Sequence, residues 1–150
     1  MNTVCTLCGQ LPQENYHVIL TCPFIKNLWR DLSPLLLKID KTQVTQIEMA
    51  FGLLTATPNS MLRNFLTYTM REMVEKQEKK AYYNSNVNNN MIDFKFKFNS
   101  RIRKYVQQSF RSSQKAAAKE TFEAFFCVNN ALATVSEEAE FEIANPFDIP

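Results

Sequence analysis

Apolar side chains recur every three or four residues along most of this chain, which is the spacing of helices that bury one face. The expected helices, in chain order, are one that begins at Pro23, a short turn of helix after Pro34, one around Val44–Phe51, and three at residues 60–83, 91–110 and 116–127. Pro34 is expected to interrupt the first helix, because proline lacks the amide that continues the hydrogen-bond ladder. The alternation at residues 94–98 also fits a strand, but the apolar steps beyond it favour a helix.

The pattern changes after residue 127. Val128–Ala131 predicts a turn, because asparagine tolerates the left-handed backbone that such turns often require. Two short runs, Leu132–Val135 and Phe141–Ile143, are expected to pair as a hairpin around Ser136–Glu138, and residues 145–150 are expected to be a loose end. The predicted fold is therefore mainly α-helical: an N-terminal Cys/His module, a helical bundle with two long helices, and a small C-terminal β-hairpin.

Composition supports a globular fold and excludes several classes of protein. The 150 residues are 45% apolar and 21% charged, which is enough to bury a core. Only Gly9 and Gly52 are glycine, which argues against sandwiches, barrels and dinucleotide-binding sheets, since these need many glycine turns. No run approaches the roughly 18–20 apolar residues of a membrane span, and no signal peptide is recognisable. We therefore expect a nuclear or cytoplasmic protein that is not secreted and has no membrane partner.

Three of the four cysteines lie in the first 22 residues, in the pattern Cys5-x2-Cys8-x8-His17-x4-Cys22, which includes the only histidine. Three thiolates and one imidazole form a common closed ligand set for zinc. Four good ligands leave no open position, so the predicted cofactor is one structural Zn²⁺ per chain. So short a module has little core of its own, and metal binding is therefore expected to be coupled to its folding.

Other interpretations of the cysteines stay open at this point. The three could be buried core residues beside an unrelated histidine, or two of them could form a disulfide and leave one unpaired. Cys127 is remote and flanked by Phe126 and Val128, which predicts a core residue. The expected organisation is a zinc module at residues 1–33 packed on the rest, a helical domain at 34–135, and an acidic tail at 136–150 that includes a possible hairpin strand.

Charge is unevenly distributed, although the formal net charge is only +2. Residues 91–119 carry eight basic side chains and one acidic one, whereas residues 120–150 carry seven acidic and no basic ones. On one side of the expected helix lie Lys97, Arg101, Lys104 and Arg111, and Arg103 lies off this stripe. These five residues are the candidate contacts to nucleic-acid phosphates. The alternative is an ordinary solvated face that pairs with the acidic tail.

The segment CTLCGQLPQENYHVILTCPFIKNLW (Cys5–Trp29) resembles the zinc-binding segment near the C-terminal end of reverse transcriptases from non-LTR (LINE-type) retrotransposons. The resemblance lies in the Cys-x2-Cys pair, the Glu before the His, the apolar run, Cys-Pro and the closing Leu-Trp. It continues through FGLLTATPNSMLRNFLTYTMREMVEKQEKKAYYN, FKFKFNSRIRKYVQQSF and FEAFFCVNNALATV, which are similar to the final section of vertebrate-type LINE reading frames. The chain departs from the family at Asn130, where glycine is frequent, and near Phe126, where tryptophan is.

This resemblance implies a zinc-binding C-terminal domain that holds template RNA or target DNA during target-primed reverse transcription, beside a polymerase region outside this chain. The sequence contains no aspartate pair of a polymerase palm and no endonuclease constellation, so we expect no catalysis by this chain. Two alternatives remain. One is a protein-interaction or scaffolding module in which the basic helix docks on an acidic surface, and the other is a host-domesticated retrotransposon fragment.

Overall fold

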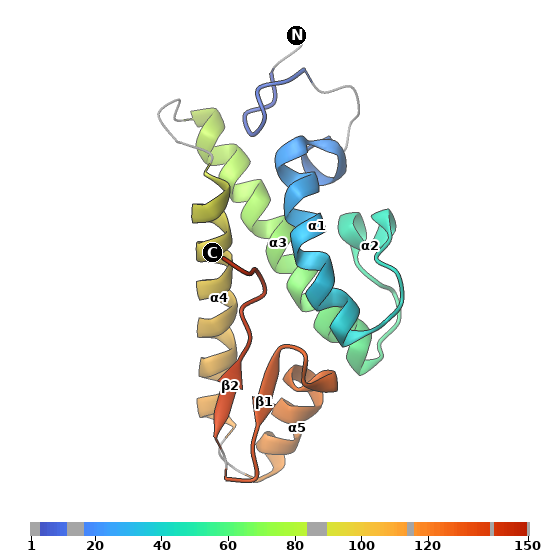
Figure 1. The fold of residues 1–150 in the computed structure, drawn as a ribbon, viewed down its shortest axis with the longest axis vertical. Helices are drawn as coiled ribbons and strands as arrows, with labels where there is room; N and C mark the ends of the chain where they lie inside the picture. Colours follow the sequence, from blue (N-terminus) through green and yellow to red (C-terminus); the bar gives the residue numbers. More distant parts are fainter. Residues whose placement is uncertain (1–3, 12–16, 84–89, 114–115, 139, 150) are drawn as a thin grey trace.

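A computed structural model describes residues 4–11, 17–83, 90–113, 116–138 and 140–149 (Figure 1). The elements in chain order are η1 (His17–Thr21), α1 (Pro23–Ile39), α2 (Gln46–Phe51), α3 (Pro58–Tyr83), α4 (Met91–Ser112), α5 (Ala116–Phe126), η2 (Val128–Asn130), β1 (Ala133–Val135) and β2 (Phe141–Ile143). The described chain is mainly helical and ends in a two-stranded antiparallel sheet, which confirms the predicted fold class.

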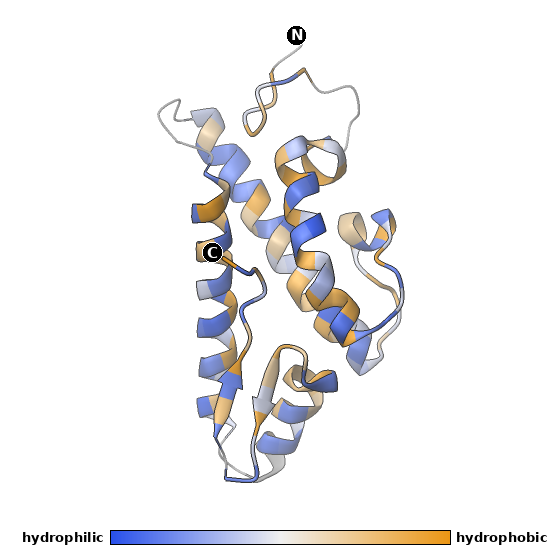
Figure 2. Cartoon of the chain, viewed as in Figure 1, coloured by the Kyte–Doolittle hydropathy of each residue, from blue (hydrophilic) through white to orange (hydrophobic). Residues whose placement is uncertain are grey.

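The long helices α3 and α4 run side by side, and α1 packs against both (Figure 1). The N-terminal residues and η1 lie at one end of this body, while α5 and the hairpin lie at the other. The side of α4 that faces away from the other helices is mainly polar (Figure 2). The fully buried apolar side chains of the three helices are Ile25, Leu28, Leu32, Leu36, Ile39, Leu62, Leu66, Met70, Phe98, Ile102 and Val106.

The first helix does not stop at Pro34, so the prediction of an interruption there is wrong. α1 continues to Ile39 because the residues on both sides of Pro34 bury the same face in one core. Pro34 itself points to solvent, and the hydroxyl of Ser33 donates a hydrogen bond to the carbonyl of Trp29 (2.7 Å). The expected domain boundary between residues 33 and 34 therefore falls inside a continuous helix.

The other helices begin and end close to the expected residues. Thr57 caps α3, since its Oγ1 accepts a hydrogen bond from the amide of Ser60 (3.2 Å). Asn90 caps α4 in the same way by accepting from the amide of Asp93 (3.1 Å). α2 ends at Gly52, whose φ of 85° is in the left-handed region that favours glycine. The expectation that residues 94–98 belong to a helix rather than a strand is confirmed.

α2 is held to α3 by a buried ion pair between Glu48 and Arg63, and both side chains are almost completely excluded from solvent. The Nε of Arg63 donates to Glu48 (2.8 Å), and its Nη1 donates to the carbonyls of Asp40 (3.1 Å) and Thr42 (2.8 Å). A buried charge is tolerated only where its hydrogen bonds are satisfied. This pair therefore fixes the position of α2 and of the loop that precedes it.

The turn and the hairpin after α5 agree with the sequence prediction. Asn129 and Asn130 have φ values of 51° and 50°, and the side-chain Nδ2 of Asn129 also donates to the carbonyl of Ile39 at the end of α1 (2.6 Å). β1 and β2 pair antiparallel, with Ala133 opposite Ile143.

The last segment is not a loose end, and this prediction is wrong. Residues 144–149, which we call the C-terminal strap, return along α4 (Figure 1). Phe147 is fully buried (0% exposed), and its ring lies 5.1 Å from the ring of Phe98. Asn99 binds the backbone of Phe147 twice, as donor to the carbonyl and as acceptor from the amide (both 2.8 Å). Two interactions thus hold the strap in place: the burial of the Phe147 ring, and the two hydrogen bonds between the Asn99 side chain and the Phe147 backbone.

Candidate metal centre

The first two cysteines lie on a tight turn at residues 5–10. The amide of Cys5 donates to the carbonyl of Gln10, and the amide of Gly9 donates to the carbonyl of Cys5 (both 2.8 Å). Gly9 has a φ of 76°, and no atom lies within 4 Å of the position that a Cβ would take there. The turn therefore needs glycine for its backbone conformation and not for space. It places the sulfurs of Cys5 and Cys8 on the same side.

The other two residues lie at the two ends of η1, a single π-helical turn. The amide of Cys22 donates to the carbonyl of His17 (2.7 Å). The donor lies five residues after the acceptor, which is the hydrogen-bond spacing of a π-helix. The indole of Trp29 donates to the carbonyl of Ile19 (2.8 Å) and so fixes η1 on α1. Cys22 directly precedes Pro23, which occupies the first position of α1. A single helical turn therefore connects His17 to Cys22, with π rather than α hydrogen bonding.

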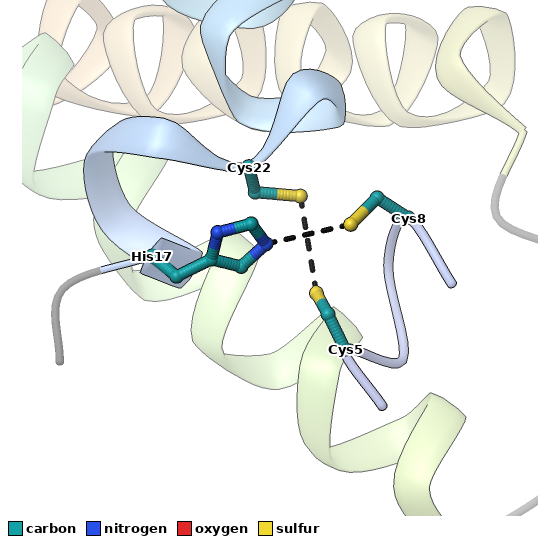
Figure 3. Close-up of side chains that lie close together, drawn as sticks. All are labelled: Cys5, Cys8, His17 and Cys22. Carbon is teal, nitrogen blue, oxygen red and sulfur yellow. Dashed lines mark hydrogen bonds between the residues drawn. The ribbon is translucent and has the colours of Figure 1, made fainter. Parts of the chain in front are cut away.

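These two pieces bring four metal-ligating atoms together, all within 4.8 Å of one another (Figure 3). The sulfurs of Cys5 and Cys22 are 3.9 Å apart, and the sulfur of Cys8 is 3.4 Å from Nε2 of His17. Sulfur ligands about 2.3 Å from a tetrahedral ion lie roughly 3.8 Å from each other, so the spacing fits such an ion. The four residues, which we call the metal cluster, could hold a metal ion.

Two of the thiols differ in how readily they lose a proton. Burial raises the pKa of Cys22 to about 12, although the amides of Ile25 and Phe24 at the start of α1 donate to its sulfur and oppose the rise. Burial also raises the pKa of Cys8, but hydrogen bonds from the Gln10 amide and from His17 outweigh it and leave that pKa below its usual value. A bound cation would favour the thiolate at both positions, and its binding would release protons.

His17 presents one ring nitrogen to the sulfurs and the other to a hydroxyl. Its Nε2 faces Cys8, and its Nδ1 lies 3.1 Å from Oγ1 of Thr21. When Nε2 is the ligand, Nδ1 carries the proton and donates to Thr21, which fixes the tautomer and the orientation of the ring. The sequence analysis did not predict that Thr21 positions His17. The spacing could have indicated it, because Thr21 follows His17 by one helical turn and so lies on the same side of the helix.

The metal cluster is attached to the helices and separated from the fourth cysteine. The hydroxyl of Thr6 donates to the carbonyl of Glu78 on α3 (3.4 Å), and Leu7 is buried. Cys127 is half-buried and packs against the core, and burial raises its pKa to about 11. Cys127 is thus an apolar packing residue, as the sequence indicated, and is not among the residues that converge on the metal cluster.

The five candidate nucleic-acid contacts do not share one environment. Arg101 forms an ion pair with Glu72 of α3 (2.6 Å), and Lys97 forms one with Asp93 (3.0 Å). Arg103 lies off the stripe and reaches the strap, where it donates to Asn145 (2.9 Å). Lys104 and Arg111 are exposed, and neither forms an ion pair with any described residue. Hydrogen bonds from Arg101 and then Lys76 lower the pKa of Glu72 and outweigh the smaller opposing effect of burial.

In the alternative drawn from the sequence, this basic helix pairs with the acidic tail. Within the described part of the chain, the basic residues of α4 form ion pairs with Asp31, Glu72 and Asp93, and none with the glutamates after residue 130. Contact between α4 and the tail instead involves Asn99, Arg103 and the buried ring of Phe147.

Comparison of the chain with protein-family models, with curated proteins and with solved structures found no match. Among the described residues, none of the helices has the length and apolar content that a membrane crossing requires. The function must therefore be argued from the residues of the metal cluster and from the surface around α4.

Proposed function

We propose that the metal cluster binds one Zn²⁺ and that this ion stabilises the N-terminal end of the domain. The observation that carries the proposal is the convergence of three sulfurs and one imidazole nitrogen within 4.8 Å. Zinc prefers this donor set and this tetrahedral spacing. The four protein ligands fill the coordination sphere, so the ion has a structural role and no open position for a substrate.

We further propose that the domain binds nucleic acid through the basic stripe of α4 and has no catalysis of its own. Lys104 and Arg111 support this role best, because both are exposed and available to phosphates. The resemblance to LINE-type reverse transcriptases supports it independently and suggests template RNA or target DNA as the partner. In that case the chain assists target-primed reverse transcription carried out by a polymerase region elsewhere in the parent protein.

A salt titration tests the nucleic-acid role. Binding of labelled RNA and DNA oligonucleotides is measured by fluorescence anisotropy at several salt concentrations, with the wild type and the variant Lys104→Glu, Arg111→Glu. Each phosphate contact contributes roughly 0.7–0.9 to the slope of log K against log salt, so the variant is expected to bind more weakly and with a shallower slope. Two acidic substitutions of exposed lysines outside α4, Lys38→Glu and Lys41→Glu, give the same net charge and serve as the control.

If the stripe variant and the control lose the same affinity, the binding reflects net charge alone and the stripe is not the contact surface. If the wild type binds neither RNA nor DNA at low salt, the nucleic-acid role is wrong.

A protein-interaction role is the second candidate, and a specific surface favours it. α2 and the loop after it expose three large apolar side chains, Ile47, Phe51 and Leu54. Exposed apolar groups that lie close together are typical of protein-binding surfaces. Nuclease treatment separates the two candidates, because a partner captured through α2 is retained after nuclease treatment and lost in the variant Ile47→Ser, Phe51→Ser.

A further inference from the structure

Three hollows adjoin one another on the surface formed by α3, α4 and α5. The first lies between α1 and α3, the second between α3 and α4, and the third between α4 and α5. Tyr68 lines both the first and the second hollow, and Tyr105 lines both the second and the third. Both tyrosines keep much of their surface in solvent, 61% for Tyr68 and 53% for Tyr105. Two exposed aromatic rings thus separate consecutive hollows.

The basic stripe of α4 adjoins the second hollow. Arg101 lines this hollow directly, and Lys104 and Arg111 lie on the neighbouring exposed face of the helix, about 100–120° around from Tyr105. At 100° per residue, Tyr105 lies about 40° from Arg101 around α4, so the ring and the guanidinium are neighbours on the helix surface. Arg103 and Asn99, which hold the strap, lie on another side of α4. The strap therefore leaves the stripe and these hollows uncovered.

The hollows differ in charge. The first is lined by one arginine, Arg71, and by three glutamates, Glu72, Glu75 and Glu78, so acidic groups outnumber basic ones there. In the second, Glu72 is neutralised by Arg101 and Lys76. The third has no charged side chain among the residues that line it, and it combines phenylalanine rings with serine and threonine hydroxyls. A polyanion beside the stripe is therefore repelled from the first hollow and accepted along the second and third.

We infer that α4 takes a single-stranded nucleic acid, with its phosphates along Lys104 and Arg111 and its unpaired bases against Tyr68 and Tyr105. This inference rests on the proposed nucleic-acid role and names the class of strand. The second hollow has a volume of about 280 Å³, just below the roughly 300–1,000 Å³ of pockets for drug-sized ligands, so it can admit one planar base. Bases in a duplex have no free faces for stacking, whereas every unpaired base does.

The test compares four labelled probes of equal length by fluorescence anisotropy: single-stranded RNA, single-stranded DNA, duplex DNA and an abasic single strand. The abasic strand carries the same phosphates without bases, so it measures the electrostatic part of binding alone. The wild type is expected to bind both base-bearing single strands more tightly than the duplex and the abasic strand. The ratio between RNA and DNA then shows which of the two the site prefers.

The variant Tyr68→Ala isolates stacking from charge. It is expected to weaken binding of the base-bearing strands by roughly 5- to 150-fold, the effect of losing one stacked base, and to leave the abasic strand unaffected. The slope of affinity against salt should not change, and Tyr68→Trp should restore binding. The matched control is Phe51→Ala, which removes an even more exposed ring from α2 (84% exposed).

Equal affinity for base-bearing and abasic strands, or unchanged binding by Tyr68→Ala, would overturn the inference but leave the proposed nucleic-acid role standing. Tighter binding of the duplex than of the single strands would also overturn the inference and leave the proposed nucleic-acid role standing. Failure of every probe to bind at low salt would overturn both.

Discussion

The N-terminal turn at residues 4–11 and the C-terminal strap at residues 144–149 contain neither helix nor strand, yet both lie fixed against helices of the same body. The turn contributes two cysteines to the metal cluster and buries little else besides Leu7. The strap buries the whole ring of Phe147 and satisfies the backbone of that residue with the side chain of Asn99. In our proposal an ion completes the first end, whereas protein atoms alone complete the second.

This difference predicts that the two ends respond differently to removal of metal. The metal cluster brings ionisable thiols and an imidazole together at the edge of the core, so a bound cation would contribute strongly to the stability of this end. The strap gains from removal of apolar surface from water and from two hydrogen bonds, which need no cofactor. Chelators should thus affect the first end and leave the second intact.

The largest expected effect is the loss of the metal in Cys22→Ser. Zinc binding is worth about 10–16 kcal/mol in zinc-finger peptides near pH 7, and one missing thiolate removes a large part of it. We expect the variant to lose its zinc and the chelator-sensitive part of its thermal unfolding. Cys127→Ser is the control, because Cys127 lies outside the metal cluster. Wild-type zinc content in Cys22→Ser would contradict the assigned ligand set.

The next effect concerns the strap. Phe147→Ala leaves a cavity beside Phe98 and is expected to lower the free energy of unfolding by about 3–5 kcal/mol in urea titrations. The zinc content should stay at the wild-type value. Phe51→Ala, at an exposed ring, should change stability by less than about 0.5 kcal/mol. A loss below about 1 kcal/mol in Phe147→Ala would mean that the strap contributes little to the fold.

The sequence predicted the metal cluster far better than the strap. Three of the four cysteines and the only histidine lie in the first 22 residues, so the chemistry of this group is visible from spacing alone. The strap depends on contacts between residues 48 positions apart, where a polar asparagine in an amphipathic helix binds a backbone. No local pattern marks Asn99 as different from other polar helix residues.

The helices show the same contrast. Their existence followed from apolar periodicity, which is a local property. The continuation of α1 through Pro34 depends on the core that both halves share, and periodicity around a single proline does not reveal it. The ion pair between Arg101 and Glu72 could not be predicted from the sequence either, because it forms only when α3 packs against α4. The hydrogen bond from Arg103 to Asn145 likewise depends on how the strap packs against α4.

A smaller effect isolates the hydrogen bonds of the strap. Asn99→Ala leaves the amide and the carbonyl of Phe147 without their partner, and it is expected to cost about 1–3 kcal/mol. Hydrogen exchange should show faster exchange at the amide of Phe147 and unchanged exchange at the amide of Leu32, near the middle of α1. Equal acceleration at both amides would indicate global unfolding rather than release of the strap.

The smallest effect is pH-dependent and involves Asp31, which pairs with Lys95 beside the ring of Phe147. Burial raises the pKa of Asp31, but hydrogen bonds from Lys95 and Arg30 outweigh it and hold that pKa below its ordinary value. The ion pair therefore stabilises the fold above the ordinary pKa of a carboxyl, and this stability is lost as the pH falls through the lowered pKa. Asp31→Asn is expected to cost about 1 kcal/mol or less at pH 7.

The measurement for Asp31 is urea unfolding of the wild type and Asp31→Asn at pH 7 and at acidic pH. The difference between the two proteins should shrink in acid, and taking that difference cancels the pH dependence of metal binding. A difference that stays constant with pH would show that the charge of Asp31 does not contribute.

The central claim is that Cys5, Cys8, His17 and Cys22 together hold one zinc ion. Elemental analysis of protein purified under reducing conditions tests it most directly, with the metal content expressed per chain. We predict about one zinc per chain, retained through gel filtration and lost after acid or strong chelation. Protein that contains no zinc, takes up none when zinc is added, and unfolds at the same temperature with or without it would contradict the claim.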